Sequence, residues 1–141
     1  MTETEELQAI AAEMAKVCPI WMLPGCCTSD GLRIVEVRPQ RKLLTVFATL
    51  ADETIVVKNV LAEAIPDLSD IATRGALWDR WCPRGSVDYD EDGDKLWHAA
   101  TCVPVRRKNS TIHDSRPVAM MRAVLAAMEA ANGKEIGRAH V

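Results

Sequence analysis

The spacing of apolar residues changes along the chain between the helical period of about 3.6 and the extended period of 2. The order of these helical and extended segments is the sequence feature that restricts the fold most. Helical spacing occurs at 3–17, in a segment that ends at 81, and at 115–131. Strand-like spacing occurs at 32–37, 43–50, 54–57, 86–89 and 95–103. Neighbouring strands are separated by short turns, which suit antiparallel hairpins and exclude parallel crossovers. We therefore predict an α+β fold, a compact single domain in which antiparallel hairpins pack with helices.

Polar residues before the helical segments predict where the helices begin. The predicted N-caps are Thr2, in a capping box with Glu5, then Asp67 or Ser69, and finally Asp114 or Ser115. Asn132-Gly133 is a predicted C-cap, so the last helix should end at Ala131. In the second helix, the residues predicted to be available for burial are Ile71, Leu77, Trp78 and Trp81.

Proline and glycine predict the connections between these elements. The segment 18–27 holds two prolines and a glycine, so we expect an irregular loop or a short extended piece against the core. Pro39-Gln40-Arg41 predicts the turn between the first two strands. Asp92-Gly93 predicts a tight hairpin turn in which the glycine takes a positive φ.

Length and charge narrow the class of protein. The chain has 141 residues, a typical length for one domain, and a net charge of −3, which gives no general attraction to nucleic acid. No apolar run approaches the roughly 18–20 residues that cross a bilayer. The acidic start MTETEELQ lacks the basic flank of a signal peptide. We therefore expect a cytoplasmic protein that binds no membrane.

The chain contains five cysteines, at positions 18, 26, 27, 82 and 102. Their odd number and wide spacing are typical of free thiols in a reducing compartment. With His98 and His113 the cysteines could supply a zinc set, but no pair has the close spacing of a usual structural site except the adjacent Cys26 and Cys27. We therefore predict buried thiols, no metal and no cofactor.

The last seven residues read as a translated sequencing adapter. A common short-read adapter strand, preceded by one G, reads GAG ATC GGA AGA GCA CAC GTC and then the stop codon TGA, which encodes Glu135 to Val141 followed by termination. We therefore expect 135–141 to be a non-native tail on a gene assembled from metagenomic reads, and we exclude it from the fold prediction. The predicted domain comprises 1–134.

Three pieces of the second half resemble a known family. They are Asp67-Leu-Ser-Asp-Ile-Ala-Thr-Arg-Gly-Ala-Leu77, the hairpin with Trp97, and Pro117-Val-Ala-Met-Met-Arg-Ala-Val-Leu-Ala-Ala-Met128. In this order, 67–131 resembles the phage ABA sandwich domain, in which a helix, a β-hairpin and a second helix follow one another. The resemblance implies a phage or prophage origin, and the family has no assigned catalytic residues to carry over.

Acidic residues gather at the turn of the second hairpin, namely Asp88, Asp90, Asp92 and Asp94. With Gly93 they match the beginning of a calcium-binding loop. Ala99 stands where that loop needs a bidentate glutamate, and the flanks read as strands. We therefore interpret the four aspartates as a solvated hairpin that contacts a partner protein, with a weak cation site as the alternative.

A basic polar segment precedes the last helix. Helix amides together with guanidinium groups can bind an anion such as phosphate, and a tryptophan can stack on a base. The predicted ligand-binding residues are Arg106, Arg107, Lys108, Ser115, Arg116 and Trp97. The alternative interpretation is a solvated loop, which is the usual role of a short charge run.

Histidine and cysteine leave an enzyme open as an alternative. His98, His113 and the thiols could serve a small cysteine or histidine hydrolase, or a metal-dependent one. The run His113-Asp114-Ser115 has the residue types of a catalytic triad. Neighbours in sequence seldom present all three side chains to one another, so a helix cap accounts better for Asp114 and Ser115.

The leading hypothesis is a non-enzymatic phage accessory protein that acts by binding and inhibits a bacterial defence system. In one version the acidic hairpin occupies a basic surface of a defence protein. In the other version a homo-oligomer sequesters a phosphorylated signalling nucleotide. A structural phage assembly component, with tryptophans as contacts, is a further alternative.

Overall fold

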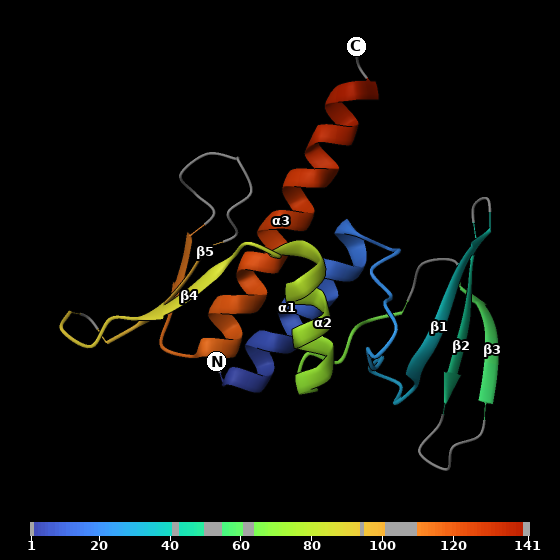
Figure 1. Cartoon of the computed structure of the whole chain (residues 1–141), viewed down its shortest axis with the longest axis horizontal. Helices are drawn as coiled ribbons and strands as arrows, with labels where there is room; N and C mark the ends of the chain where they lie inside the picture. Colours follow the sequence, from blue (N-terminus) through green and yellow to red (C-terminus); the bar gives the residue numbers. More distant parts are fainter. Residues whose placement is uncertain are drawn as a thin grey trace.

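This computed structural model describes residues 2–40, 43–49, 55–60, 64–93, 95–100 and 110–139 (Figure 1). Within these ranges the chain forms three helices, α1 (Glu3–Val17), α2 (Ile71–Trp81) and α3 (Arg116–Ala139). The strands are β1 (Arg33–Gln40), β2 (Leu43–Thr49), β3 (Ile55–Val60), β4 (Ser86–Tyr89), β5 (Trp97–Ala100) and β6 (Ser110–His113). They form two antiparallel sheets, so the predicted α+β class is confirmed.

Helix α1 has the predicted bounds because a cap and an apolar face act together. The Thr2 hydroxyl accepts a hydrogen bond from the Glu5 N–H at 3.2 Å. Glutamates in the first turn lie at the positive end of the helix dipole. Leu7, Ile10 and Met14 recur at helical spacing and are buried. Through this face α1 joins the core beside α3.

The segment 18–27 forms the predicted irregular loop, and the irregular backbone continues to 32, with isolated bridges at Cys27 and Thr28. Trp21 anchors this loop, since its side chain is 1% exposed. Its indole N–H donates a hydrogen bond to the Ala64 carbonyl oxygen at 2.7 Å. The contact satisfies a buried donor and ties the loop to the chain just before α2.

Strands β1, β2 and β3 form one sheet in that order, which stands beside the helices (Figure 1). At the start of β1, Ile34 is buried in the core, and a bulge leaves Val35 exposed. The predicted turn at Pro39-Gln40-Arg41 is wrong in part, because β1 continues through Pro39 and Gln40. Proline is tolerated there because β1 is an edge strand, where a missing N–H need not break the ladder.

Helix α2 begins later than predicted, because its N-cap is Asp70 and not Asp67 or Ser69. The Asp67 carboxylate instead accepts hydrogen bonds from the Ser69 N–H and hydroxyl, which forms a turn before the helix. Leu77 is fully buried as predicted, whereas Ile71 is 77% exposed. The prediction for Ile71 is wrong because the first helical residue faces outward when the helix begins at this position.

Strands β4, β5 and β6 form the second sheet, and α3 packs against one of its faces. Ala99 in β5 and Val118 and Met121 in α3 are fully buried. A small residue in the strand lets the helix lie close to the sheet. Strand β6 is absent from the sequence prediction, which placed these residues in a loop although Thr111 and Ile112 are β-branched.

Helix α3 begins at Arg116, so the predicted cap Ser115 occupies the N-cap position. The Val118 N–H donates to the Ser115 hydroxyl at 3.4 Å. The predicted end at Asn132-Gly133 is wrong, because the helix runs to Ala139 through good helix formers such as lysine, glutamate and alanine. Although α3 has 24 residues, no helix in the described ranges is long and apolar enough to cross a membrane.

Candidate functional site

The hairpin of β4 and β5 projects away from the helices and carries the acidic turn (Figure 1). The register pairs Val87 with Ala99 on the face toward α3, and pairs Asp88 with His98 on the opposite face. Asp88 is exposed, as are Glu91 and Asp92 at the turn. The predicted partner-binding aspartates 88 and 92 therefore face solvent. Asp94 lies outside the described residues.

Asp90 holds the turn together. Its N–H donates to the Leu96 carbonyl at 3.0 Å, and its carboxylate accepts from the Gly93 N–H at 2.8 Å. The predicted positive φ at Gly93 is wrong. In this turn it is Lys95 that takes the left-handed conformation, with φ 56°. The Asp90 side-chain hydrogen bond spans three residues and satisfies the Gly93 amide without a primed hairpin turn. Asp90 is therefore structural, and Glu91 joins the outward-facing carboxylates.

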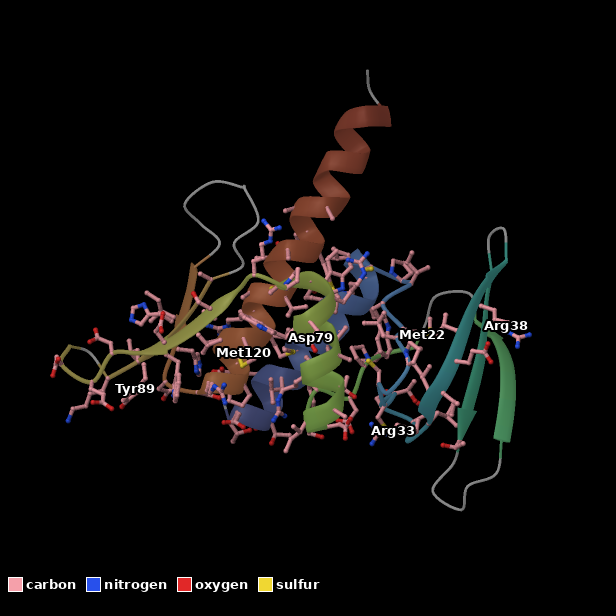
Figure 2. All side chains as sticks on the ribbon, in the orientation of Figure 1. Met22, Arg33, Arg38, Asp79, Tyr89 and Met120 are labelled. Carbon is pink, nitrogen blue, oxygen red and sulfur yellow. The ribbon has the colours of Figure 1, made fainter. Side chains whose placement is uncertain are left out.

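An aromatic pair lies at the turn end of the hairpin, where β4 ends and β5 begins. The rings of Tyr89 and Trp97 have their centroids 4.9 Å apart at an interplanar angle of 45°. The Arg116 guanidinium, at the start of α3, lies 5.5 Å from the centre of the Trp97 ring. Figure 2 shows Tyr89 on the hairpin, well away from the β1–β3 sheet that carries Arg38. The structure thus brings together Trp97 and Arg116 of the predicted ligand site.

The rest of the predicted ligand site is divided. Arg106, Arg107 and Lys108 lie outside the described residues. Ser115 caps α3, and its hydroxyl donates to the Glu3 carboxylate of α1 at 2.8 Å. The positive end of the α3 dipole therefore already faces a carboxylate from within the chain.

His113 is a structural tie between β6, α1 and α3. Its Nδ1 accepts a hydrogen bond from the Ser115 N–H at 2.8 Å, so the ring proton lies on Nε2, 2.7 Å from the Glu6 carboxylate. Asp114 also lies 2.8 Å from Nδ1, but it is 80% exposed and would need a second ring proton. Because both ring nitrogens are engaged and the Ser115 hydroxyl bonds to Glu3, these residues do not form a serine–histidine nucleophile.

Glu6 completes this tie from α1. Its Oε2 is buried and makes no hydrogen bond of good geometry, although it lies 2.7 Å from His113 Nε2. Arg122 of α3 lies 3.8 Å from the same oxygen. The three side chains hold the N-terminal ends of α1 and α3 together with β6.

Cys26 and Cys27 are free thiols, and the Cys26 and Cys82 side chains are buried. Burial raises the pKa of the Cys26 thiol to about 11 and also raises the pKa of Cys27. A thiolate nucleophile needs the opposite shift. Across the described ranges, no group of three or more histidine, cysteine or acidic side chains is placed to hold a metal ion.

We expect Cys26 to react with iodoacetamide at pH 8 about a hundredfold more slowly in the folded protein than in urea, because its thiolate is scarce and shielded. Peptide mass spectrometry after timed alkylation measures the rate at this residue. The urea-unfolded chain is the control, and equal rates in the two states would contradict the burial of this thiol.

A second charged cluster fixes α2 to the loop before β1. The Arg33 guanidinium forms a two-pronged ion pair with Asp70, with N–O distances of 2.7 and 3.1 Å (Figure 2 shows Arg33 at the start of β1). The Asp70 carboxylate also accepts from the N–H and hydroxyl of Thr73. These hydrogen bonds, that of Arg33 first, lower the pKa of Asp70 to about 2. This N-cap was not predicted from the sequence, although the three-residue spacing of Asp70 and Thr73 was a signal that could have indicated it.

No family model, curated protein or solved structure matches the chain.

Proposed function

We propose that this chain acts by binding, and that its acidic hairpin occupies a basic surface of a partner protein. The observation that carries the proposal is the projecting hairpin, on which Asp88, Glu91 and Asp92 face solvent. Within the described part of the chain, none of these three side chains forms an ion pair. Their charge is therefore available to a partner.

Electrostatic complementarity supports this mode of binding. Unpaired carboxylates on a narrow, projecting hairpin attract a positively charged surface and speed the encounter with it. Protein surfaces that read nucleic acid are rich in lysine and arginine, so they carry the required positive charge. The acidic hairpin would compete with nucleic acid for these surfaces. The Asp90 hydrogen bonds hold the turn in one conformation before binding, which lowers the entropic cost of association.

The class of partner that we propose is a nucleic-acid-binding component of a bacterial defence system. This choice rests on the resemblance of 67–131 to a phage domain, because a phage accessory protein with an acidic binding element suits the inhibition of such a component. The chain would then be a non-enzymatic inhibitor.

We expect the triple variant Asp88→Lys, Glu91→Lys, Asp92→Lys to lose inhibition. In a host that carries a nucleic-acid-targeting defence system, the parent chain should raise the plating of a restricted phage by at least about tenfold. Reversing three contacts should weaken binding by more than the roughly 1.4 kcal/mol that corresponds to a tenfold change in affinity. The variant should give the plating of an empty vector. Asp90 is left intact so that the turn is kept.

A matched variant controls for net charge. Asp30→Lys, Asp79→Lys, Glu129→Lys reverses the same number of exposed acidic side chains outside the hairpin and should inhibit like the parent chain. If both triple variants lose or both keep inhibition, the hairpin is not the binding element.

A second candidate function is sequestration of a phosphorylated nucleotide, which is favoured by the contact between Arg116 and Trp97. The variant Arg116→Glu separates the two functions, because it reverses the charge beside the ring and leaves the hairpin turn unchanged. Loss of inhibition in Arg116→Glu, with inhibition kept in the hairpin variant, would favour sequestration. The carboxylate of Glu3 at the start of α3 makes the hairpin the stronger candidate.

A further inference from the structure

A cavity in the helical body carries an inference that does not depend on the hairpin. We propose that it binds an aliphatic carboxylate, a straight hydrocarbon chain with one acidic group. The cavity lies where α1 and α2 end beside α3 and has a volume of about 400 Å³. This volume falls within the range of roughly 300–1,000 Å³ that is usual for small-molecule sites.

The walls of the cavity are mainly apolar. They are formed by Val17, Ile20, Trp21, Leu23, Trp81 and Met128, together with three neighbouring residues of similar character and one arginine. Trp21 and Met128 are almost fully buried and give a rigid floor, whereas Ile20 is 69% exposed. An exposed isoleucine beside an open apolar cavity is costly in water, and a hydrocarbon chain in the cavity would cover it.

Arg80 supplies the charge that selects the ligand. Among the described residues, it is the only lysine, arginine, aspartate or glutamate that lines the cavity. Its guanidinium carbon lies 4.6 Å from the centre of the Trp81 ring, which holds the side chain beside the cavity. In the described part of the chain it has no carboxylate partner, so its N–H groups can bind one from a ligand.

The dipoles of the two helices that end at the cavity determine where the acidic group of the ligand lies. α1 ends at Val17 and α2 at Trp81, so the negative ends of two helix dipoles lie at the cavity. They disfavour an anion inside the cavity. The acidic group therefore lies outside beside Arg80, and the hydrocarbon chain fills the apolar interior.

Titration of the 141-residue chain with decanoate and with 1-decanol, followed by tryptophan fluorescence and calorimetry, tests this site. We expect decanoate to saturate one site per chain with a dissociation constant below 1 mM, and about tenfold more tightly than decanol, as a charge-assisted hydrogen bond predicts. Arg80→Gln should abolish the preference for decanoate and leave decanol binding unchanged. Lys95→Gln, on the hairpin, is the matched control and should bind like the parent chain.

A second variant tests the location. Ala131→Trp places a large side chain at the cavity wall and should abolish binding of both probes, with folding verified by circular dichroism. Absence of saturable decanoate binding, equal affinity for the two probes, or binding that survives Ala131→Trp would each overturn the proposal. A dimer that Ala131→Trp dissociates, without decanoate binding, would assign the cavity to a second copy and overturn it as well.

Discussion

Replacing Asp70 with alanine is expected to lower the free energy of unfolding by about 3 kcal/mol, because one carboxylate serves as helix cap and as ion-pair partner. It accepts hydrogen bonds from the N–H and hydroxyl of Thr73 and from both terminal nitrogens of Arg33. The Thr73 hydroxyl in turn accepts from the Cys27 N–H at 2.7 Å. Loss of the carboxylate therefore weakens the joint between α2 and the loop, and leaves Arg33 half-buried without its partner.

The same carboxylate makes stability depend on pH. Its pKa is about 2 in the folded protein against an ordinary value of 3.8, chiefly because of Arg33. A lowered pKa adds stability that is fully present above pH 4 and is lost as the pH falls toward 2. The lowered pKa of Asp70 corresponds to about 2 kcal/mol of folding stability. Solvent screens the ion pair because the Arg33 side chain is 42% exposed, so this value is near the upper limit.

Urea unfolding at pH 7, 4 and 2.5 measures both effects. Asp70→Ala should be less stable than the parent chain at pH 7, and the difference should shrink at pH 2.5. Asp79→Asn, at an exposed position on the same helix, is the control and should change stability by less than about 0.5 kcal/mol. A difference between parent chain and Asp70→Ala that stays constant over this pH range would contradict the role of Arg33.

Replacing Gly85 with alanine is expected to cost about 3 kcal/mol, because the new methyl group has no room. A Cβ at this position would lie 2.6 Å from Cζ2 of Trp78 and 2.8 Å from the backbone oxygen of Ala100. The Ala100 oxygen belongs to β5 and cannot move without disturbing the sheet. Gly85 therefore allows α2 to lie close to the hairpin that we propose as the binding element.

Gly75→Ala is the matched control for Gly85→Ala. Gly75 lies within α2, and a Cβ there would meet no atom within 4 Å. Alanine is the better helix former, so this variant should gain about 0.5–1 kcal/mol. Thermal and urea unfolding of both variants measure the effects, and a Gly85→Ala protein as stable as the parent chain would contradict the close packing at this position.

The sequence predicts those elements whose formation depends on local signals. α1 combines a threonine cap with regular apolar spacing, and both are visible without tertiary structure. The α+β class follows in the same way from the order of helical and extended segments. The hairpin of β4 and β5 is predicted because polar turn residues separate two short strands.

Other features depend on contacts between distant residues, which a single sequence does not display. Asp70 is selected over Asp67 as helix cap by Arg33, which lies far away in the sequence. Strand β6 is too short to show a period of its own and forms because β5 offers an open edge. The extension of α3 to Ala139 depends on the cooperativity of a long helix, which outweighs the unfavourable glycines Gly133 and Gly137.

The candidate site is partly visible in the sequence. The acidic turn stands out by composition, and the structure adds that Asp90 is structural and that Glu91 faces outward. Trp97 and Arg116 were predicted to belong to one ligand-binding site, and in the structure the Arg116 guanidinium lies over the Trp97 ring. The cavity beside Arg80 had no sequence signal, because its walls come from three separate segments.

The most direct test of hairpin binding is amide hydrogen exchange of the chain, free and in complex with the partner that it inhibits. We expect slower exchange in the complex for 86–93, the strand and turn that carry the outward carboxylates, with the exchange of α2 and the middle of α3 unchanged. Protection confined to other elements, with the exchange of 86–93 the same in both states, would show that the acidic hairpin is not the binding element.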